Sequence, residues 1–456
     1  MQRKIRLTPV RLLALVYIGI IFLGAVLLVL PFSTKDGLST SFSDALFATR
    51  DGQGASFEDA LFTATSATCV TGLIIYDTFE HWTMFGQIVI LLLIQTGGIG
   101  FMTLVFGIWK IGGKKIGIQA RTFMQESVNA PTVGGLVGLS SMILIGTLIF
   151  EGAGAFLLSF RFIPDYGWGM GIYISVFTSV SAFCNAGFDL MGINEPFSSL
   201  TRYSADPIVT LTVSALIIVG GIGFFVWRDL CQNKLHFKKY SLHTKLVLTT
   251  TAILIVVPFL IILCSENSVP WGGERVLTSL FLAVSPRTAG FNTLPLTSLR
   301  GSTIAITILL MFIGGSSGST AGGIKTTTFA TLILSMFSLV KRKKSVQCFG
   351  RRLDEDSCRH ASRFITLFLC IAATGVLAIM LIDGWAGFTD VIFEVFSAIG
   401  TVGLSLGITP DLHVASQMIL ALLMYLGRVG CLTFMLMFKD VSAPTAELPH
   451  EAVRIG

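Results

Sequence analysis

Long apolar stretches alternate with polar segments along most of this chain. Each of eight stretches is long enough to cross a bilayer, which takes about 20 apolar residues in a helix. They run over residues 12–30, 84–108, 136–160, 207–227, 243–263, 303–339, 361–381 and 415–438. The first is too long for a signal peptide and lacks a small-residue cleavage site before Pro31, so we expect it to stay as an anchor. The pattern predicts an all-α integral membrane protein with eight transmembrane helices.

Basic residues are unevenly distributed among the polar segments. The N-terminus, the segments 109–122, 228–245 and 340–363, and the C-terminal tail hold 23 of the 32 Lys and Arg residues. By the positive-inside rule these segments face the cytoplasm, so we expect a multi-pass plasma-membrane protein with both termini cytoplasmic. Apart from Lys245 and Arg363 at the span ends, only Lys325 and Arg428 fall inside predicted spans.

The outer segments contain semi-apolar stretches that are too short to cross a bilayer. These stretches are residues 56–67, 171–182, 273–284 and 388–398. We interpret them as re-entrant helices that enter the membrane and return. Non-helical backbone at membrane depth is tolerated only where protein buries it or where it lines a water-filled cavity. Four re-entrant segments therefore predict a lined cavity.

A heptapeptide of the form SAx[CG]xxG follows three of these short stretches. It occurs as Ser66 to Gly72, Ser181 to Gly187 and Ser397 to Gly403, and a degenerate copy, Val284 to Gly290, keeps the final glycine. The final glycines recur at intervals of 103 to 115 residues. Such a period indicates a fourfold internal repeat.

A second glycine-rich motif occurs in the span after each heptapeptide. It occurs as Gly97-Gly98-Ile99-Gly100, Gly220-Gly221-Ile222-Gly223, Gly314-Gly315-Ser316-Ser317-Gly318 and Gly427-Arg428-Val429-Gly430. Each repeat is therefore predicted to be a span, a re-entrant helix and a second span (M1-P-M2). We place the repeats at residues 1–110, 111–230, 231–343 and 344–456, in a pseudo-fourfold arrangement around one pore.

Composition excludes several other classes of protein. Of the 456 residues 53% are hydrophobic and 13% are charged, whereas soluble domains have about 45–50% and about 25%. The net charge of +6 does not indicate a nucleic-acid partner, because in a membrane chain the placement of charges matters more than their sum. The eight cysteines form no CxxC pair and are interpreted as buried thiols, and the six histidines lack metal-ligand spacing. We expect no transition metal and no cofactor in this chain.

The repeated glycines are suited to a filter for a dehydrated cation. Rings of backbone carbonyls replace the hydration shell of such an ion, and glycine adopts the positive φ that this backbone needs. The re-entrant helices would direct their partially negative C-terminal ends at the axis, and 18 of the 26 acidic residues lie on the outer half. The predicted potassium-binding residues are Cys69, Val70, Thr71, Gly72, Cys184, Asn185, Ala186, Gly187, Thr288, Ala289, Gly290, Gly400, Thr401, Val402 and Gly403.

The span 303–339 is too long for one crossing and is interrupted by small and polar residues. Lipid cannot satisfy the backbone groups of such a run, so we expect it to line the pore below the filter as a movable gate. Arg428 is expected to donate hydrogen bonds to its carbonyls. The predicted gating residues are Gly314, Gly315, Ser316, Ser317, Gly318, Ser319, Thr320, Ala321, Gly322, Gly323, Lys325 and Arg428.

The same run imitates two enzyme motifs. It approaches a Walker A sequence, but Ile324 separates Gly323 from Lys325 and no strand precedes it. Its GxSG pattern is typical of serine hydrolases, yet that chemistry needs a histidine at membrane depth. We therefore expect that this chain is not an enzyme. An intramembrane serine protease remains a remote alternative. A secondary carrier for a small metabolite is the stronger alternative, because carriers also use broken helices and repeats.

The fourfold M1-P-M2 pattern, the filter-like Thr401-Val402-Gly403 and the interruption at 314–323 resemble the Ktr/Trk/HKT superfamily of potassium transporters over nearly the whole chain. The chain is most similar to the KtrB-type membrane subunit. The resemblance implies potassium uptake by a homodimer that sits on a cytoplasmic, nucleotide-binding RCK ring of the KtrA type, with glycine at all four filter positions favouring potassium. The Pro286-Arg287 pair departs from the pattern. Channel-like and sodium-coupled uptake are both compatible with the residues.

Overall fold

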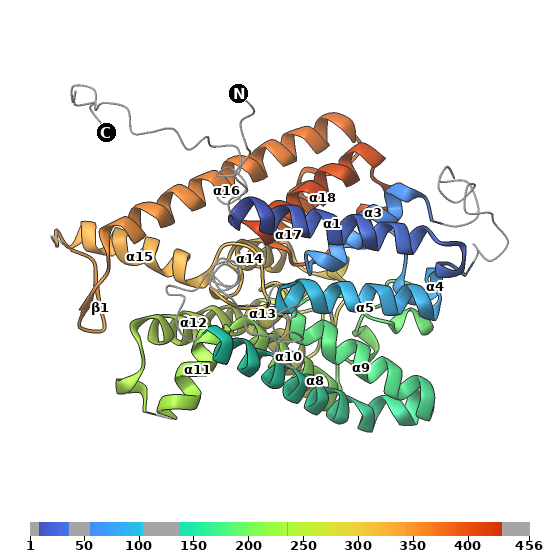
Figure 1. Ribbon diagram of the computed structural model, residues 1–456, viewed down its shortest axis with the longest axis horizontal. Coiled ribbons are helices and arrows are strands. Elements are labelled where there is room, and N and C mark those ends of the chain that lie inside the picture. Colours follow the sequence, from blue (N-terminus) through green and yellow to red (C-terminus); the bar gives the residue numbers. More distant parts are fainter. Residues whose placement is uncertain are drawn as a thin grey trace.

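The structure is a computed structural model of the chain and describes residues 9–35, 55–101, 103, 136–234, 236–343 and 345–430. Nearly all of the regular structure in these residues is helical (Figure 1). The exception is a small hairpin of strands β1 (Gln347–Cys348) and β2 (Arg351–Arg352), which projects from one end of the molecule. The predicted helical class is therefore confirmed.

Four helices of the described residues are long and apolar enough to cross a membrane on their own. They are α1 (Pro9–Val29), α8 (Leu136–Tyr166), α12 (Leu242–Ser265) and α16 (Glu355–Ile382). Their outward faces expose large apolar side chains such as Phe22 (57% exposed), Leu148 (68%) and Leu260 (51%). Apolar surface of this extent calls for lipid, because water would penalise it strongly.

The other predicted spans correspond to shorter apolar helices. These are α5 (Met84–Ile99), α14 (Gly301–Phe312), α15 (Thr326–Val340) and α18 (Val414–Val429). Helices α14 and α15 are the two halves of the span that was predicted to be broken. The ends of the predicted spans 84–108 and 415–438 lie outside the described residues, so the total of eight spans stays a prediction.

The prediction of one continuous span over 207–227 is wrong. Helix α10 (Pro207–Gly221) ends early, and α11 (Phe224–Asn233) leaves it at an angle of 94°. The N–H of Phe224 donates at 2.7 Å to the carbonyl of Gly318, which belongs to the interruption in span 303–339. The bend therefore arises where a distant segment replaces the helical hydrogen-bond partner.

Each short stretch interpreted as re-entrant forms a helix. These helices are α3 (Phe57–Thr68), α9 (Trp168–Cys184), α13 (Gly273–Val284) and α17 (Phe388–Gly400). Ser56 caps α3 by accepting the N–H of Asp59 at 3.2 Å. The four helices contact the long helices that precede them, α1, α8, α12 and α16. Long and short helices therefore alternate along the chain as packed pairs.

Short helical turns complete the described structure, and they lie in the connections between these helices. They are η1 (Pro31–Ser33), α4 (Thr78–His81), η3 (Met191–Ile193), η4 (Thr201–Tyr203), η5 (Phe237–Lys239), η6 (Leu296–Ser298) and η7 (Thr409–Asp411).

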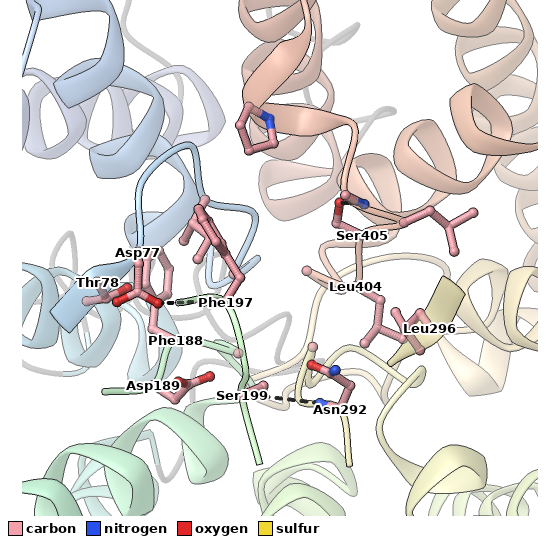
Figure 2. A pocket seen from close by; sticks show the side chains of 18 of the residues that line it. Asp77, Thr78, Phe188, Asp189, Phe197, Ser199, Asn292, Leu296, Leu404 and Ser405 are labelled. Atoms are coloured by element: carbon pink, nitrogen blue, oxygen red, sulfur yellow. Dashed lines mark hydrogen bonds between the residues drawn. The ribbon is translucent and has the colours of Figure 1, made fainter. Parts of the chain in front are cut away.

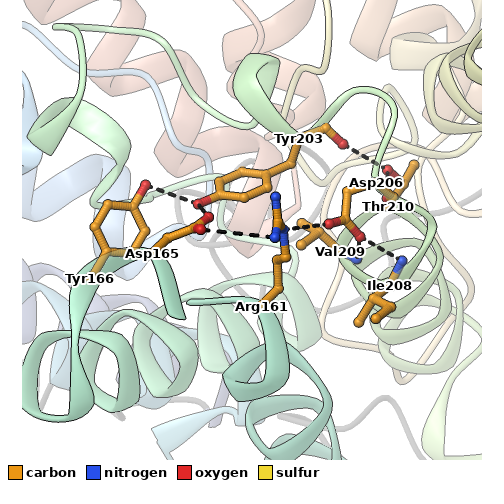
Figure 3. A network of polar contacts seen from close by, with 8 residues as sticks. All are labelled: Arg161, Asp165, Tyr166, Tyr203, Asp206, Ile208, Val209 and Thr210. Atoms are coloured by element: carbon orange, nitrogen blue, oxygen red, sulfur yellow. Dashed lines mark hydrogen bonds and ion pairs between the residues drawn. The ribbon is translucent and has the colours of Figure 1, made fainter. Parts of the chain in front are cut away.

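A polar network ties the end of α8 to the start of α10 (Figure 3). The Arg161 guanidinium lies 2.7 Å from Asp206, which also caps α10 by accepting the N–H of Ile208 at 2.8 Å. The Tyr203 hydroxyl donates to Asp165 at 2.8 Å. This network fixes the outer connection of the second predicted repeat.

The cysteines do not all behave as predicted. All seven that the structure describes are free, and Cys69 and Cys184 are buried as expected. The prediction is wrong for Cys231, which is exposed in α11 within the predicted cytoplasmic segment, and for Cys264 and Cys370, which are exposed on the long apolar helices α12 and α16; Cys348 and Cys358 are only partly buried. A thiol is apolar enough to face lipid, and apolar periodicity alone does not distinguish a lipid-facing position from a core position.

Candidate functional site

Three of the short helices end in the same backbone motif. The N–H of Thr71 donates at 2.8 Å to the carbonyl of Ser66, and that of Val70 donates at 3.1 Å to the carbonyl of Ala67. The residues that follow α9 and α17 repeat both bonds, Ala186 to Ser181, Asn185 to Ala182, Val402 to Ser397 and Thr401 to Ala398. This is the Schellman arrangement, in which the residue after the helix takes a left-handed conformation.

The left-handed residues are unusual in type. Glycine normally occupies this place, but here Val70, Asn185 and Thr401 have φ values of 57°, 59° and 52°. A β-branched residue in this region costs on the order of 1–3 kcal/mol and persists only where the surroundings enforce it. Such strain points to a functional constraint on these segments.

Helix α13, the third short helix along the chain, ends differently from the other three. After α13 the N–H of Ala289 donates to Ser285, so its bond is one residue out of step with the other three copies. Pro286, which lacks an N–H, lies within this turn. Thr288 nevertheless has a φ of 83°. The departure noted in the sequence changes the end of the helix but leaves the following segment comparable in shape.

The four segments after these helices meet in a closed ring. We call residues 70–72, 185–187, 288–290 and 401–403 the glycine segments; each ends in a glycine whose φ lies between 73° and 95°. A Cβ on any of these glycines would collide with the backbone of the next segment. The contacts run from Gly72 to Ala186, from Gly187 to Ala289, from Gly290 to Val402 and from Gly403 to Thr71. The ring therefore has no room for a side chain at any glycine position.

The serine of the heptapeptide orients the glycine. The hydroxyl of Ser66 accepts the N–H of Gly72 at 3.1 Å, and the hydroxyl of Ser397 accepts the N–H of Gly403 at 3.0 Å. Since each N–H is bound behind its segment, the carbonyl oxygens are free to face the axis. The sequence pattern marked these serines as part of the motif but did not predict this bond.

The second glycine motif allows the following helix to approach each short helix closely. A Cβ on Gly97 would collide with the carbonyl oxygen of Thr68, the last residue of α3. Gly220 meets Phe183 and Gly427 meets Ile399 in the same way. Both sequence motifs therefore serve one backbone contact, in which the second helix supports the end of the first.

A cavity of about 490 Å³ opens directly above the ring (Figure 2). All four glycines line it, together with Asp77, Asp189 and Asp411, and its described lining includes no lysine or arginine. Burial, together with the nearby charge of Asp77, raises the pKa of Asp189 to about 6, although the N–H of Met191 that donates to it opposes the shift. The cavity is therefore a region of negative potential that attracts cations.

The buried carboxylate of Glu394 in α17 holds one wall of this cavity. It accepts the Leu406 N–H at 3.1 Å and the Thr409 hydroxyl at 2.8 Å, and it also accepts the hydroxyl of Ser405. Glu394 is fully buried. The acid thus fixes the loop that follows Gly403.

The interrupting loop (residues 313–325), which joins α14 to α15, closes the other side of the ring. Its ends pair, because the N–H of Gly314 donates to Ile324 at 2.8 Å. The loop packs against side chains of three glycine segments. Gly314 contacts Thr288, Gly322 contacts Thr401, and the Thr320 hydroxyl lies 3.1 Å from the amide nitrogen of Asn185. It therefore lies directly beneath the ring.

Two partly buried cations hold this loop. The Arg428 guanidinium donates to the carbonyl of Thr320, and it also donates to the carbonyls of Gly97 and Gly98 at the end of α5. The Lys325 ammonium donates to Ala321 at 2.7 Å. Within the described residues both cations bind backbone carbonyls and no carboxylate. The expected contact between Arg428 and the loop is thus present in the structure.

Some predicted site residues lie apart from the ring. Cys69, Cys184 and Gly400 cap or end their helices and stand outside the glycine segments. The Cys184 thiol points away, toward Gln95 at 3.6 Å and toward Glu151 in α8. Glu151 is one of the 18 acidic residues counted above on the outer half, although a lone carboxylate inside the apolar run 136–160 is itself a signal of an intramembrane site.

The fold and the site together define an integral membrane protein whose helices surround a central, glycine-lined constriction. The model of the TrkH family, described as "Cation transport protein", matches residues 38–445. The chain belongs to this family, whose members are transporters and not enzymes. The protease alternative is thereby excluded.

Relatives of similar length agree with this family. The chain is 39% identical to the potassium/sodium uptake protein NtpJ of Enterococcus hirae, over 100% of this chain and 99% of that protein. It is 41% identical to the Ktr system potassium uptake protein B of Bacillus subtilis, over 99% and 98%. The crystal structure of the potassium transporter TrkH from Vibrio parahaemolyticus has the same fold, with a TM-score of 0.73 and 18% identity over 96% of this chain and 87% of that chain.

Proposed function

We propose that this chain is the potassium-conducting subunit of a Ktr-type uptake system in the plasma membrane. The observation that carries the proposal is the closed ring of four positive-φ glycines. A ring of this kind offers layers of backbone carbonyls to a dehydrated ion, which is the chemistry of potassium selection. The names of the Enterococcus and Bacillus relatives support potassium as the ion.

The proposed architecture is four M1-P-M2 repeats around one pore. Its support is the pairing of each long helix with a short one and the recurrence of the Schellman ends. In this arrangement the fifteen residues predicted from the heptapeptides form the potassium filter, mainly through the backbone of the glycine segments. The acidic cavity above them would be the outer entrance.

The interrupting loop is proposed as the gate. It covers the inner side of the ring, and Arg428 and Lys325 place positive charge there. Charge at this place raises the barrier to a passing cation. Opening therefore requires the loop to leave the three glycine segments that it contacts.

The proposal includes partners that the chain itself does not contain. The Bacillus relative is named as part of a Ktr system, which supports a multi-component transporter. We propose a homodimer bound to a cytoplasmic RCK-type ring that carries the regulatory nucleotide, with both termini of this chain cytoplasmic. The proposal includes dependence of uptake on sodium, and its support is that the Enterococcus relative is named for both ions.

Rubidium uptake into proteoliposomes tests this function. The expected result is saturable rubidium uptake that excess potassium suppresses more strongly than sodium or lithium does, and that the cytoplasmic partner increases. Uptake that instead saturates with an organic metabolite and ignores these cations would favour a carrier and overturn the proposal.

A further inference from the structure

Thr320 connects the interrupting loop to the second glycine segment. It is fully buried, and its hydroxyl donates to the carbonyl of Phe183 at 3.1 Å while accepting the amide N–H of Asn185 at 3.1 Å. Its own carbonyl accepts the Arg428 guanidinium, and its N–H donates to Gly220 at 3.3 Å. One loop residue thus joins the end of α9, the end of α10 and the cation that holds the loop.

The second glycine segment needs this support more than the first and fourth do. In those two copies the heptapeptide serine binds the glycine N–H, through Ser66 and Ser397. The corresponding hydroxyl of Ser181 is buried without a hydrogen-bond partner in the described structure. The second segment is therefore held by the Thr320 hydroxyl of the loop, whereas the glycines of the first and fourth segments are held by a serine of their own helix.

Asn185 is the strained residue that receives this support. Its φ is 59°, it is 1% exposed, and its amide oxygen has no partner among the described residues. The bond to Thr320 fixes the side-chain amide and with it the carbonyl-bearing backbone on either side. The counterparts of Asn185 contact the loop only by packing or not at all, since Val70 packs on Gly97 and Thr288 packs on Gly314.

We propose that Thr320 is a positioning residue that couples the gate to ion selection. When the loop lies beneath the ring, the Thr320 hydroxyl holds Phe183 and Asn185 in the geometry that favours potassium. When the loop leaves, the second segment loses the hydrogen bonds of Thr320 and discriminates less between potassium and sodium. This inference rests on the proposed function and extends it, because gate position and selectivity become linked, and such a link acts in both directions.

Replacing Thr320 by valine tests the coupling. Valine keeps the shape and removes the hydroxyl, and the loss of one or two buried hydrogen bonds predicts a roughly fivefold fall in the preference for potassium over sodium. The readout is rubidium uptake into proteoliposomes at graded sodium and potassium. Thr320→Ser keeps the hydroxyl and should retain the preference. Thr307→Val is the matched control, because Thr307 is a buried threonine of α14 whose hydroxyl bonds only within its helix.

The outcomes separate this inference from the proposed function. A wild-type protein without potassium-sensitive rubidium uptake would overturn both. A wild-type preference that survives in Thr320→Val, even with increased total flux, would overturn the coupling alone. If Thr320→Val does not fold, Asn185→Ser removes the hydrogen bond to Thr320 by changing its donor. A potassium preference that survives in Asn185→Ser would then overturn the coupling. Because Thr320→Val also removes the bond to Phe183, the inference predicts a loss in Asn185→Ser no larger than that in Thr320→Val, and no further loss in the double variant.

Discussion

At the scale of single residues, the ring of glycines leaves no tolerance for a side chain. Each of the four φ values is positive, and each Cβ position is already occupied by the backbone of a neighbouring segment. A substitution must therefore move two segments at once. The collision displaces the backbone carbonyls of the ring, because the helices behind the ring are fixed by their own packing.

Replacing Gly403 by serine should lower potassium preference by about tenfold or more, since the Cβ displaces the Thr71 carbonyl. Competition of sodium and potassium for rubidium uptake measures this. The same result is expected for Gly72, Gly187 and Gly290. Gly19→Ala serves as the control because its Cβ would meet nothing within 4 Å. Wild-type selectivity in all four ring variants would exclude the ring as the filter.

The raised pKa of Asp189 predicts a pH dependence of uptake. Its carboxyl is ionised above a pH of about 6 and protonated below it, so the negative potential of the cavity weakens as the pH falls through that value. Uptake at low rubidium should fall by roughly two- to fivefold between pH 7.5 and 5. Asp189→Asn should be slower at pH 7.5 and lose this step. A variant that keeps the full pH step would assign it to another group.

Arg428→Gln should raise flux and reduce dependence on the cytoplasmic partner. The change removes a positive charge beneath the ring and most of the donors that bind Thr320 and the end of α5. Flux with and without the partner measures both effects. Reduced or unchanged flux in a folded variant would mean that Arg428 supports the structure and does not act as a barrier.

At the scale of elements, the decisive feature is that the interrupting loop replaces the middle of a helix. The first half, α14, ends at Phe312 and the second half, α15, begins at Thr326. The loop between them exchanges backbone hydrogen bonds with the end of α10, through Gly221, and with the start of α11, through Phe224. The surface that the loop packs against is thus formed largely by other parts of the chain.

Deleting residues 314–323, or replacing them by alanines, should increase flux severalfold in the absence of the partner. The deletion removes the obstruction beneath the ring. The alanines extend the helix, so this part of the chain no longer lies beneath the ring. Uptake in proteoliposomes measures the change, and the thermal stability of the purified variant is the control. Unaltered flux in a stable variant would mean that the loop is only a kink in the span and does not act as a gate.

The sequence predicted these elements unevenly, for physical reasons. The short helices were found because their apolar runs are local, and the break in span 303–339 was found because its composition is local. The bend between α10 and α11 was missed because its cause, the carbonyl of Gly318, lies about 95 residues away in the chain. The role of Glu151 was missed because its partners, Gln95 and Cys184, come from other helices.

At the scale of the whole molecule, internal repetition predicted which residues are equivalent but not how the copies differ. The glycines meet as the repeat implied, yet the third copy supplies the loop, the second receives it, and the fourth holds it through Arg428. These unequal roles depend on contacts between copies. No single repeat carries the information, so only the folded chain reveals it.

The closed ring also has a consequence for biosynthesis. Arg428 and its partner Gly97 are 331 residues apart, and the last glycine, Gly403, must contact Thr71 of the first segment. At ribosomal rates of about 5–20 residues per second, the first segment waits roughly 15–65 s for its final neighbour. Until Gly403 arrives, the first glycine segment lacks its last neighbour, and lipid cannot satisfy the backbone groups that remain exposed. The nascent protein therefore needs protection in the membrane until its last quarter arrives.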